Sequence, residues 1–247
     1  MKKGVLLSLV FVAIAALNTF GQPNDLSIHN LVGKVKRFDE QLATLEEKNG
    51  VVKEHKSVSK ASRFFDENGR LSHESFSGTT SSERQFIYEK NGVRKSVTET
   101  TQPFEKPGSV KIPSYSVSIF KYDEKDNSMS QDIYHGKIQA GPLLETGDPG
   151  NKYKYFFDNE NRLTKEILME PDGKEIMTEE YFYRGSGPTA SDIVLLSKGR
   201  ALQFIKCTYE VDALGNWTKK TAVRKPVDPR KPTVNEVTYR KITYYKN

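Results

Sequence analysis

The fold is decided by the stretch Phe64-Phe65-Asp66-Glu67-Asn68-Gly69-Arg70-Leu71 and by four further segments that repeat its pattern. The other copies occupy residues 87–93, 120–127, 156–163 and 209–217. In each copy a run of aromatic and β-branched residues stops at an acid, turns through Asn or Gly, and resumes as a strand. Aromatic and β-branched runs bounded by such turn residues are typical of β-hairpins. The sequence therefore predicts five copies of one β-hairpin.

Each position of the repeat has a physical role in the turn. Asp66 can accept a hydrogen bond from the backbone two residues later, and the next two residues suit the centre of a type I turn. Gly69 can take the positive φ that a Cβ would penalise. A type I turn followed by a left-handed residue makes a bulged hairpin loop. Asn127 and Asn161 replace the glycine in two copies, and Asn is the next most tolerant residue there.

The start of the chain has the three regions of a secretory signal peptide. Lys2 and Lys3 precede an apolar run over residues 5–17, and residues 18–22 turn polar around Gly21. The run is shorter than the ~20 apolar residues that a membrane-spanning helix needs. We therefore predict a signal peptide over residues 1–21, a single domain over 22–247, and an exported protein, periplasmic or extracellular, that does not span the membrane.

Composition narrows the fold class and the partners. Loss of residues 1–21 removes two lysines and no acid, so the net charge falls from +6 to +4. The charges of both signs are interspersed, which argues against a nucleic-acid surface. The 12 Tyr and 13 Phe carry much of the apolar content, and aromatic residues pair well across strands. The sole cysteine, Cys207, excludes an intramolecular disulfide and is interpreted as a buried apolar residue.

We predict an all-β protein, an antiparallel meander of repeated hairpins that forms an extended or partly rolled sheet of about ten to fourteen strands. Residues 41–48 fit either a helical turn or, as we favour, a strand that a hairpin turn joins to the next one. Residues 191–198 fit a short strand or a turn of helix. Prolines and glycines predict loops over residues 101–113 and 140–151. Neither face of residues 237–245 is wholly apolar, which places this last strand at or near a sheet edge.

The repeat resembles the unit of the bacterial RHS, or YD, repeat family, which reads aromatic-x-Tyr-Asp-x-x-Gly-Arg-Leu. Residues 64–72 and 156–164 match this unit well, and residues 209–220 with 239–244 resemble the closing segment of exported RHS-like proteins of unknown function. The acidic turn residues lie 23, 34, 35 and 54 positions apart, whereas large RHS shells use evenly spaced units. The resemblance implies a hairpin sheet and carries no activity with it.

Candidate chemistry is sparse. The four histidines His29, His55, His73 and His135 are dispersed, so no metal or other cofactor is expected. Glu179 and Glu180 are neighbours on a predicted strand, whose alternation sends them to opposite faces. A carboxylate pair assembled from distant residues stays open, because its separation depends on the fold.

The candidate ligand site is a stacking platform made by Trp217 with Tyr239 and Tyr244 on the facing strand, suited to a sugar or a peptide. The alternative role for Trp217 is an aromatic residue that packs on the sheet.

The sequence leaves two classes of function open. The first is a non-enzymatic binding or scaffolding surface in the cell envelope, with an envelope protein or glycan as partner. The second is a hydrolase that acts on envelope polysaccharide.

Overall fold

The structure is a computed structural model, and it describes residues 25–29, 31–49, 51–78, 81–88, 94–101, 114–136 and 148–246. The signal peptide, the turn of the second hairpin copy and most of the two predicted Pro- and Gly-rich loops lie outside the described residues. Export therefore stays a prediction. No helix within the described ranges is long and apolar enough to cross a membrane.

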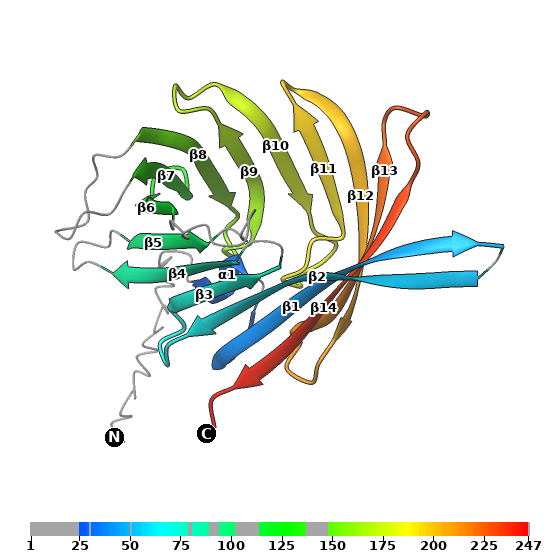
Figure 1. The fold of residues 1–247 in the computed structure, drawn as a ribbon, viewed down its shortest axis with the longest axis horizontal. Helices are drawn as coiled ribbons and strands as arrows, with labels where there is room; N and C mark the ends of the chain where they lie inside the picture. Colours follow the sequence, from blue (N-terminus) through cyan, green and yellow to red (C-terminus); the bar gives the residue numbers. More distant parts are fainter. Residues whose placement is uncertain are drawn as a thin grey trace, which may run out of the picture.

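The described residues form fourteen strands and one short helix. In chain order the elements are α1(Asp25–Ile28), β1(Val35–Lys48), β2(Val51–Phe65), β3(Leu71–Ser77), β4(Ser81–Tyr88), β5(Arg94–Thr101), β6(Ser114–Asp123), β7(Ser128–Gly136), β8(Asp148–Phe157), β9(Leu163–Met169), β10(Glu175–Phe182), β11(Asp192–Ser197), β12(Arg200–Val211), β13(Trp217–Pro226) and β14(Val234–Tyr244). Each strand pairs antiparallel with its neighbours in sequence (Figure 1). The predicted all-β antiparallel meander is confirmed.

The sheet also closes on itself. β1 pairs with β2 on one side and with β14 on the other, so that the fourteen strands form a closed barrel. Closure goes beyond the partly rolled sheet that the sequence predicted. It makes the predicted edge position of the last strand wrong, because β14 is hydrogen-bonded to both β13 and β1.

The hairpin turns have the predicted geometry. The Asp66 carboxylate accepts hydrogen bonds from the backbone N–H groups of Asn68 and Arg70, both at 2.9 Å. Gly69 has φ +76°, and Asn161 has φ 59° at the equivalent place in the fourth copy. The strand register shifts by one residue beside these turns, between Phe64 and Phe65 and between Phe156 and Phe157, as bulged loops require.

The two ambiguous segments are strands. Residues 41–48 belong to β1, which pairs with β2 up to the Lys48–Val51 pair, and residues 192–197 form β11. The loop prediction over residues 140–151 extends too far, because β8 begins at Asp148. The register with β7 shifts beside Pro149, and a proline is tolerated at such an irregularity because the ladder is interrupted there.

Substituting Gly69 tests the turn assignment. A Cβ at Gly69 would lie 2.7 Å from the Leu26 Cδ1 atom of α1, and a β-branched residue opposes the positive φ. We expect Gly69→Val to lower the free energy of unfolding by at least about 1–2 kcal/mol, measured by urea denaturation. Gly173→Val is the comparison, because Gly173 has a similar positive φ of +90° but nothing near its Cβ position. It should therefore cost only the φ penalty, which is less than the cost of Gly69→Val. A stability unchanged in Gly69→Val would contradict the assignment.

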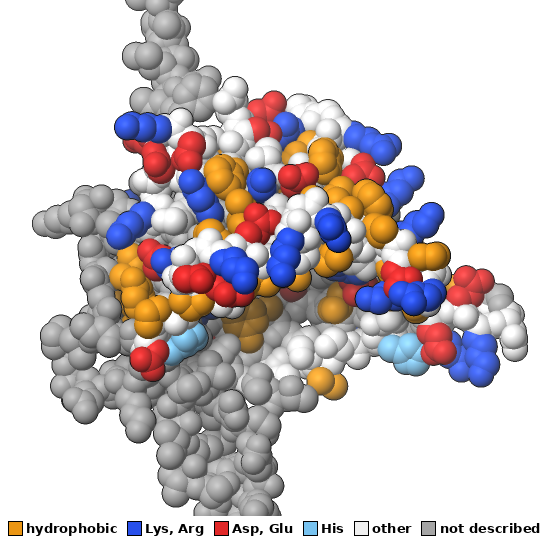
Figure 2. Space-filling view, turned by 90° about the horizontal axis from the view of Figure 1, so that it is seen from above, with side chains coloured by type: hydrophobic (Ala, Val, Ile, Leu, Met, Phe, Trp, Pro, Cys, Tyr) orange, Lys and Arg blue, Asp and Glu red, His pale blue; other side chains and the backbone are white. Residues whose placement is uncertain are grey.

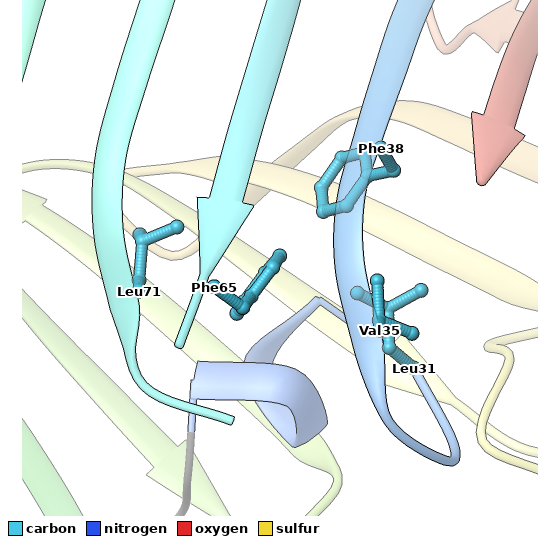
Figure 3. Packing of buried hydrophobic residues seen from close by; sticks show 5 residues of the cluster. All are labelled: Leu31, Val35, Phe38, Phe65 and Leu71. Atoms are coloured by element: carbon cyan, nitrogen blue, oxygen red, sulfur yellow. The ribbon is translucent and has the colours of Figure 1, made fainter. Parts of the chain in front are cut away.

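The segment of α1 lies inside the closed sheet. Leu26 packs against a buried cluster from β1–β3 and the preceding loop, made of Leu31, Val35, Phe38, Phe65 and Leu71 (Figure 3). Ile28 packs against a second cluster, made of Phe120, Met129 and Phe157 on β6–β8. A helix that contacts strands so far apart in the meander must lie on their shared inner face. Eight strands enclose just enough room for side chains, so fourteen enclose more, and α1 fills part of it.

Candidate functional site

Two bands of polar side chains lie on the inner face of the barrel. Side chains alternate between the faces of a strand, and directly paired residues share a face. The pairs Arg240–Glu40, Glu74–Arg84, Tyr155–Glu166 and Glu166–Glu179 therefore each occupy a single face. The contacts of α1 with this side of the sheet identify it as the inner face.

The first band is an ion belt formed by Arg240, Glu40, Arg63, Glu74 and Arg84, which come from β14, β1, β2, β3 and β4. Glu40 accepts from Arg240 Nη2 at 2.7 Å and from Arg63 Nη1 at 2.6 Å. Glu74 accepts from Arg63 Nε at 2.5 Å and from Arg84 Nη1 at 3.1 Å. Each acid thus lies between two arginines, and the charges within the belt are paired.

The belt is buried, and its electrostatics follow from that burial. The Arg240 side chain is only 4% exposed, and desolvation lowers its pKa to about 10 although Glu40 opposes the change. Burial also disfavours ionised Glu40, but Arg240 and Arg63 together hold the pKa of that carboxyl below its ordinary value. The Arg240 guanidinium additionally lies 3.6 Å from the Trp217 ring centroid and 4.3 Å from that of Phe38. These contacts indicate a structural role for the belt.

The N-terminal segment is tied to the same half of the barrel. Asp25 accepts hydrogen bonds from the backbone N–H of Leu71 at 2.8 Å and from the Tyr88 hydroxyl at 2.5 Å, and it forms an ion pair with Arg94. Arg240 donates to the backbone carbonyl of His29 at 2.9 Å. This half of the interior is therefore occupied by the protein itself.

The second band is the tyrosine–carboxylate site, formed by Tyr153, Tyr155, Glu166, Glu179 and Tyr181 on β8, β9 and β10. The Tyr181 hydroxyl lies 2.7 Å from Glu179 Oε2 and 3.4 Å from Glu166 Oε2, so it bridges two carboxyls that are paired across the strands. The Tyr153 and Tyr155 rings are nearly parallel, with centroids 6.1 Å apart. All five side chains are half-buried.

No basic side chain of the described residues forms an ion pair with either carboxyl of this site. Within the described part of the chain, the groups that act on Glu166 are Glu179 and Tyr181, and no cation is among them. Desolvation, and then the charge of Glu179, raise the pKa of Glu166 to about 7, although the hydrogen bond from Tyr181 opposes the rise. Burial and both glutamates also raise the pKa of Tyr181, so this hydroxyl stays a hydrogen-bond donor. Near neutral pH the pair therefore holds a proton that is easily gained or lost.

This raised pKa makes stability depend on pH. The folded protein keeps the Glu166 proton up to about pH 7, whereas the unfolded chain loses it above its ordinary value of 4.5. Stability is therefore greatest below pH 4.5 for this group and falls as the pH rises toward 7. We expect Glu166→Gln to raise the free energy of unfolding by roughly 2–3 kcal/mol more at pH 8 than at pH 4, in urea titrations.

Glu180→Gln is the control for that titration. Glu180 is the neighbour of Glu179 on the outer face, where it lies 3.8 Å from Lys165. Its substitution is expected to change stability by less than about 1 kcal/mol. An effect of Glu166→Gln that is the same at both pH values would contradict the raised pKa.

The structure does not assemble the predicted stacking platform. Trp217 is buried, with 4% of its surface exposed, because Arg240 and Tyr209 cover it. Tyr239 lies on the outer face and donates to Glu54 at 2.9 Å. The Tyr244 hydroxyl contacts Asp212 and accepts from Asn216 at 2.7 Å. The prediction that Trp217 is part of an exposed platform is therefore wrong. Trp217 has the alternative role, an aromatic residue that packs on the sheet.

The sequence did not indicate which residue lies beside Glu179. Glu179 and Glu180 do point to opposite faces, as alternation predicts. Glu166, on the preceding strand, is the residue that meets Glu179. The turn between β9 and β10 does not by itself reveal this pairing, because the register shifts between Glu175 and Met177. Cys207 is buried and free, as expected.

The outer surface carries charges of both signs. Figure 2 shows Lys and Arg side chains interspersed with Asp and Glu side chains and hydrophobic residues over the face in view. Several of these charges form exposed pairs, such as Lys154 with Asp126 at 2.8 Å and Lys219 with Glu210 at 2.6 Å. This mixed surface matches the interspersed charges of the sequence.

No family model matches the chain, and no curated protein matches it. Among solved structures, a porin-like protein from Bacteroides uniformis has a TM-score of 0.41 and 11% identity, with 85% of this chain and 96% of that chain covered. A porin-like protein from Bacteroides vulgatus has a TM-score of 0.38 and 10% identity, covering 84% and 98%. A DUF1329 family protein from Desulfovibrio piger has a TM-score of 0.29 and 11% identity, covering 85% and 86%. The resemblance to the RHS family stays a prediction.

Proposed function

We propose that the protein is a non-enzymatic, exported binding protein of the cell envelope, and that its ligand lies against the tyrosine–carboxylate site. The observation that carries this proposal is the contrast between the two halves of the inner face. In the ion belt every charge has a partner and the N-terminal segment covers the surface. In the tyrosine–carboxylate site two carboxyls face each other across neighbouring strands, and among the described residues the side chain that contacts both of them is a tyrosine.

Burying like charges together is unfavourable unless something compensates for it. The half-buried state of the five side chains means that solvent, and therefore a ligand, can reach them. Binding sites in proteins commonly combine aromatic surfaces with a few polar groups that fix the orientation of the ligand. The site has that composition, since Leu168, Met177 and Leu195 flank its polar members on the same face.

Thermal denaturation with a panel of soluble envelope components, including glycans and peptides, tests this proposal. A ligand that binds only the folded state at 100 times its Kd stabilises it by about 2.7 kcal/mol. We expect such a stabilisation in the wild-type protein and in Glu180→Gln, and its loss in Glu179→Gln. A stabilising ligand that does not distinguish Glu179→Gln from Glu180→Gln would contradict this site.

A second candidate function, hydrolysis of a glycosidic bond, is favoured by the carboxylate pair itself. The Oε2 atoms of Glu166 and Glu179 lie 3.4 and 2.7 Å from the same Tyr181 hydroxyl, so the two carboxyls are close neighbours. Retaining glycosidases hold their two carboxyls ~5–5.5 Å apart. A carboxyl with a pKa of about 7 beside a second carboxylate also meets the needs of a general acid and a nucleophile. In this reading Glu166 is the acid and Glu179 the nucleophile.

Incubation of the protein with neutral oligosaccharides distinguishes the two functions. Intact oligosaccharides after prolonged incubation support binding alone. Shortened products that form at enzyme-like rates, and disappear in both Glu166→Gln and Glu179→Gln but not in Glu180→Gln, would establish the hydrolase instead.

A further inference from the structure

We infer that the tyrosine–carboxylate site takes a neutral carbohydrate, with the sugar ring packed on tyrosine side chains and its hydroxyl groups hydrogen-bonded to the Glu166–Glu179 pair. This inference rests on the proposed binding function and names the class of its ligand. Three features of the site carry it, namely its ring surfaces, its mixture of hydrogen-bond donors and acceptors, and its lack of a cationic group.

The ring surfaces come from β8. Tyr153 and Tyr155 are two residues apart on one strand, so their rings lie on the same face, and the planes of the two rings differ by only 9°. The Tyr155 hydroxyl is fixed by a 2.9 Å hydrogen bond to Gln131 Oε1. Gln131 is in turn held by a 3.1 Å bond to Ser118. Tyrosine rings held in this way offer a rigid surface of limited polarity, which suits the C–H groups of a pyranose ring.

The donors and acceptors come from β9 and β10. Tyr181 donates its hydroxyl to Glu179, which fixes that carboxyl as an acceptor. Glu166 lies across the strand from Glu179, and the raised pKa of its carboxyl gives it a proton to donate near neutral pH. A carboxylic acid beside a carboxylate offers one donor and several acceptors. Sugar hydroxyls are both donors and acceptors, so they can use both kinds of group.

The side chains around Glu166 also favour a neutral ligand. Across β8 it faces Tyr155, and across β10 it faces Glu179 and Tyr181; on β11 the next inner-face residues are Ile193 and Leu195. Two arginines act on the neighbouring tyrosines, Arg84 on Tyr153 and Tyr155 and Arg94 on Tyr155. The Arg84 guanidinium is engaged by Glu74 and Thr98, and the Arg94 guanidinium is paired with Asp25. No basic side chain of the described residues is therefore placed to bind an anionic ligand between the two glutamates.

The test measures affinities by isothermal titration calorimetry at pH 6.0 and pH 8.5. The probes are three neutral oligosaccharides, maltohexaose, cellohexaose and hexa-N-acetylchitohexaose, and one polyamine, spermidine. We expect at least one oligosaccharide to bind, with an affinity that falls on the order of tenfold at pH 8.5, because the loss of the Glu166 proton removes a donor and buries a second charge. We expect Glu166→Gln, which keeps a neutral donor, to bind that sugar with little dependence on pH.

Variants connect the result to the site. Glu179→Gln and Tyr153→Ala are expected to weaken binding of the oligosaccharide at least tenfold, whereas Glu180→Gln leaves it unchanged. Failure of all three oligosaccharides to bind would overturn the carbohydrate assignment. Binding of spermidine that strengthens at pH 8.5 and is lost in Glu179→Gln would also overturn it, while leaving the proposed binding function in place. Sugar binding that is indifferent to all of the inner-face substitutions would overturn both.

Discussion

Deletion of residues 237–247 is expected to yield insoluble or protease-sensitive protein, because it removes most of the strand that closes the barrel. β14 is hydrogen-bonded to β13 and to β1, so its loss leaves two long strands with unpaired edges. Unpaired edges of this kind promote aggregation. The deletion also removes Arg240 from the ion belt, together with the buried side chain of Val237, which is 3% exposed.

A shorter deletion is the control. Removal of residues 246–247 alone keeps β14 and the two contacts of Tyr245, whose hydroxyl donates to Phe65 and whose N–H donates to Lys34. We expect this variant to be soluble and to melt near the wild-type temperature. A chain without residues 237–247 that stays soluble with an unchanged melting temperature would show that these residues are a dispensable tail.

The substitution Arg240→Met is expected to lower the free energy of unfolding by about 3–5 kcal/mol, measured by urea denaturation at pH 7. Of its two arginine partners, Glu40 would keep only Arg63. Removing one of the positive charges that balance a buried carboxylate is destabilising. The stacking of the guanidinium on Trp217 and Phe38 would be lost as well.

Lys241→Met is the matched control, because Lys241 follows Arg240 in the sequence and is exposed on the opposite face. Its substitution is expected to change stability by less than about 0.5 kcal/mol. If the two variants were equally stable, the ion belt would have no structural role.

The turns of this fold could be predicted from the sequence because their chemistry is local. Asp66, Asp158 and Asp212 each accept hydrogen bonds from backbone N–H groups two and four residues later, and Gly69, Asn161 and Gly215 each have a positive φ. A turn formed by five neighbouring residues depends little on the rest of the chain. The hairpin meander follows from these turns.

Closure of the sheet could not be predicted in the same way. It depends on the pairing of β1 with β14, whose paired residues Glu40 and Arg240 lie 200 positions apart. The mixed polarity of the last strand suggested an edge, whereas its inner face is polar because Arg240 joins the ion belt. A buried polar face therefore looks, in the sequence, like a solvated one.

The candidate site was missed for a related reason. If β9 and β10 paired without a bulge from their turn onward, Glu166 would lie opposite Thr178. Side chains alternate along a strand, so Glu166 and Glu179 would then lie on opposite faces of the sheet. A shift of register between Glu175 and Met177 moves Glu166 opposite Glu179. A shift of one residue exchanges the two faces of a strand. Composition does not reveal such a bulge, so the carboxylate pair appears only in the structure.

The burial of Trp217 could not be predicted from its local sequence either. Its place after a turn and before a basic strand suggested exposure, yet the basic residue that matters is Arg240 on the neighbouring strand, which lies over the indole ring. An arginine stacked on tryptophan can bury both side chains when an acid such as Glu40 balances the charge.

The most direct test of the proposed function is to map the ligand by nuclear magnetic resonance. Backbone amide shifts of the labelled protein would be recorded as the tightest-binding oligosaccharide is added. We predict that the largest changes fall on residues 153–155, 166 and 179–181, with small changes on β14 and β1–β3. Changes confined to outer-face residues or to the ion belt, or no changes at saturating sugar, would contradict a ligand site on the inner face of β8–β10.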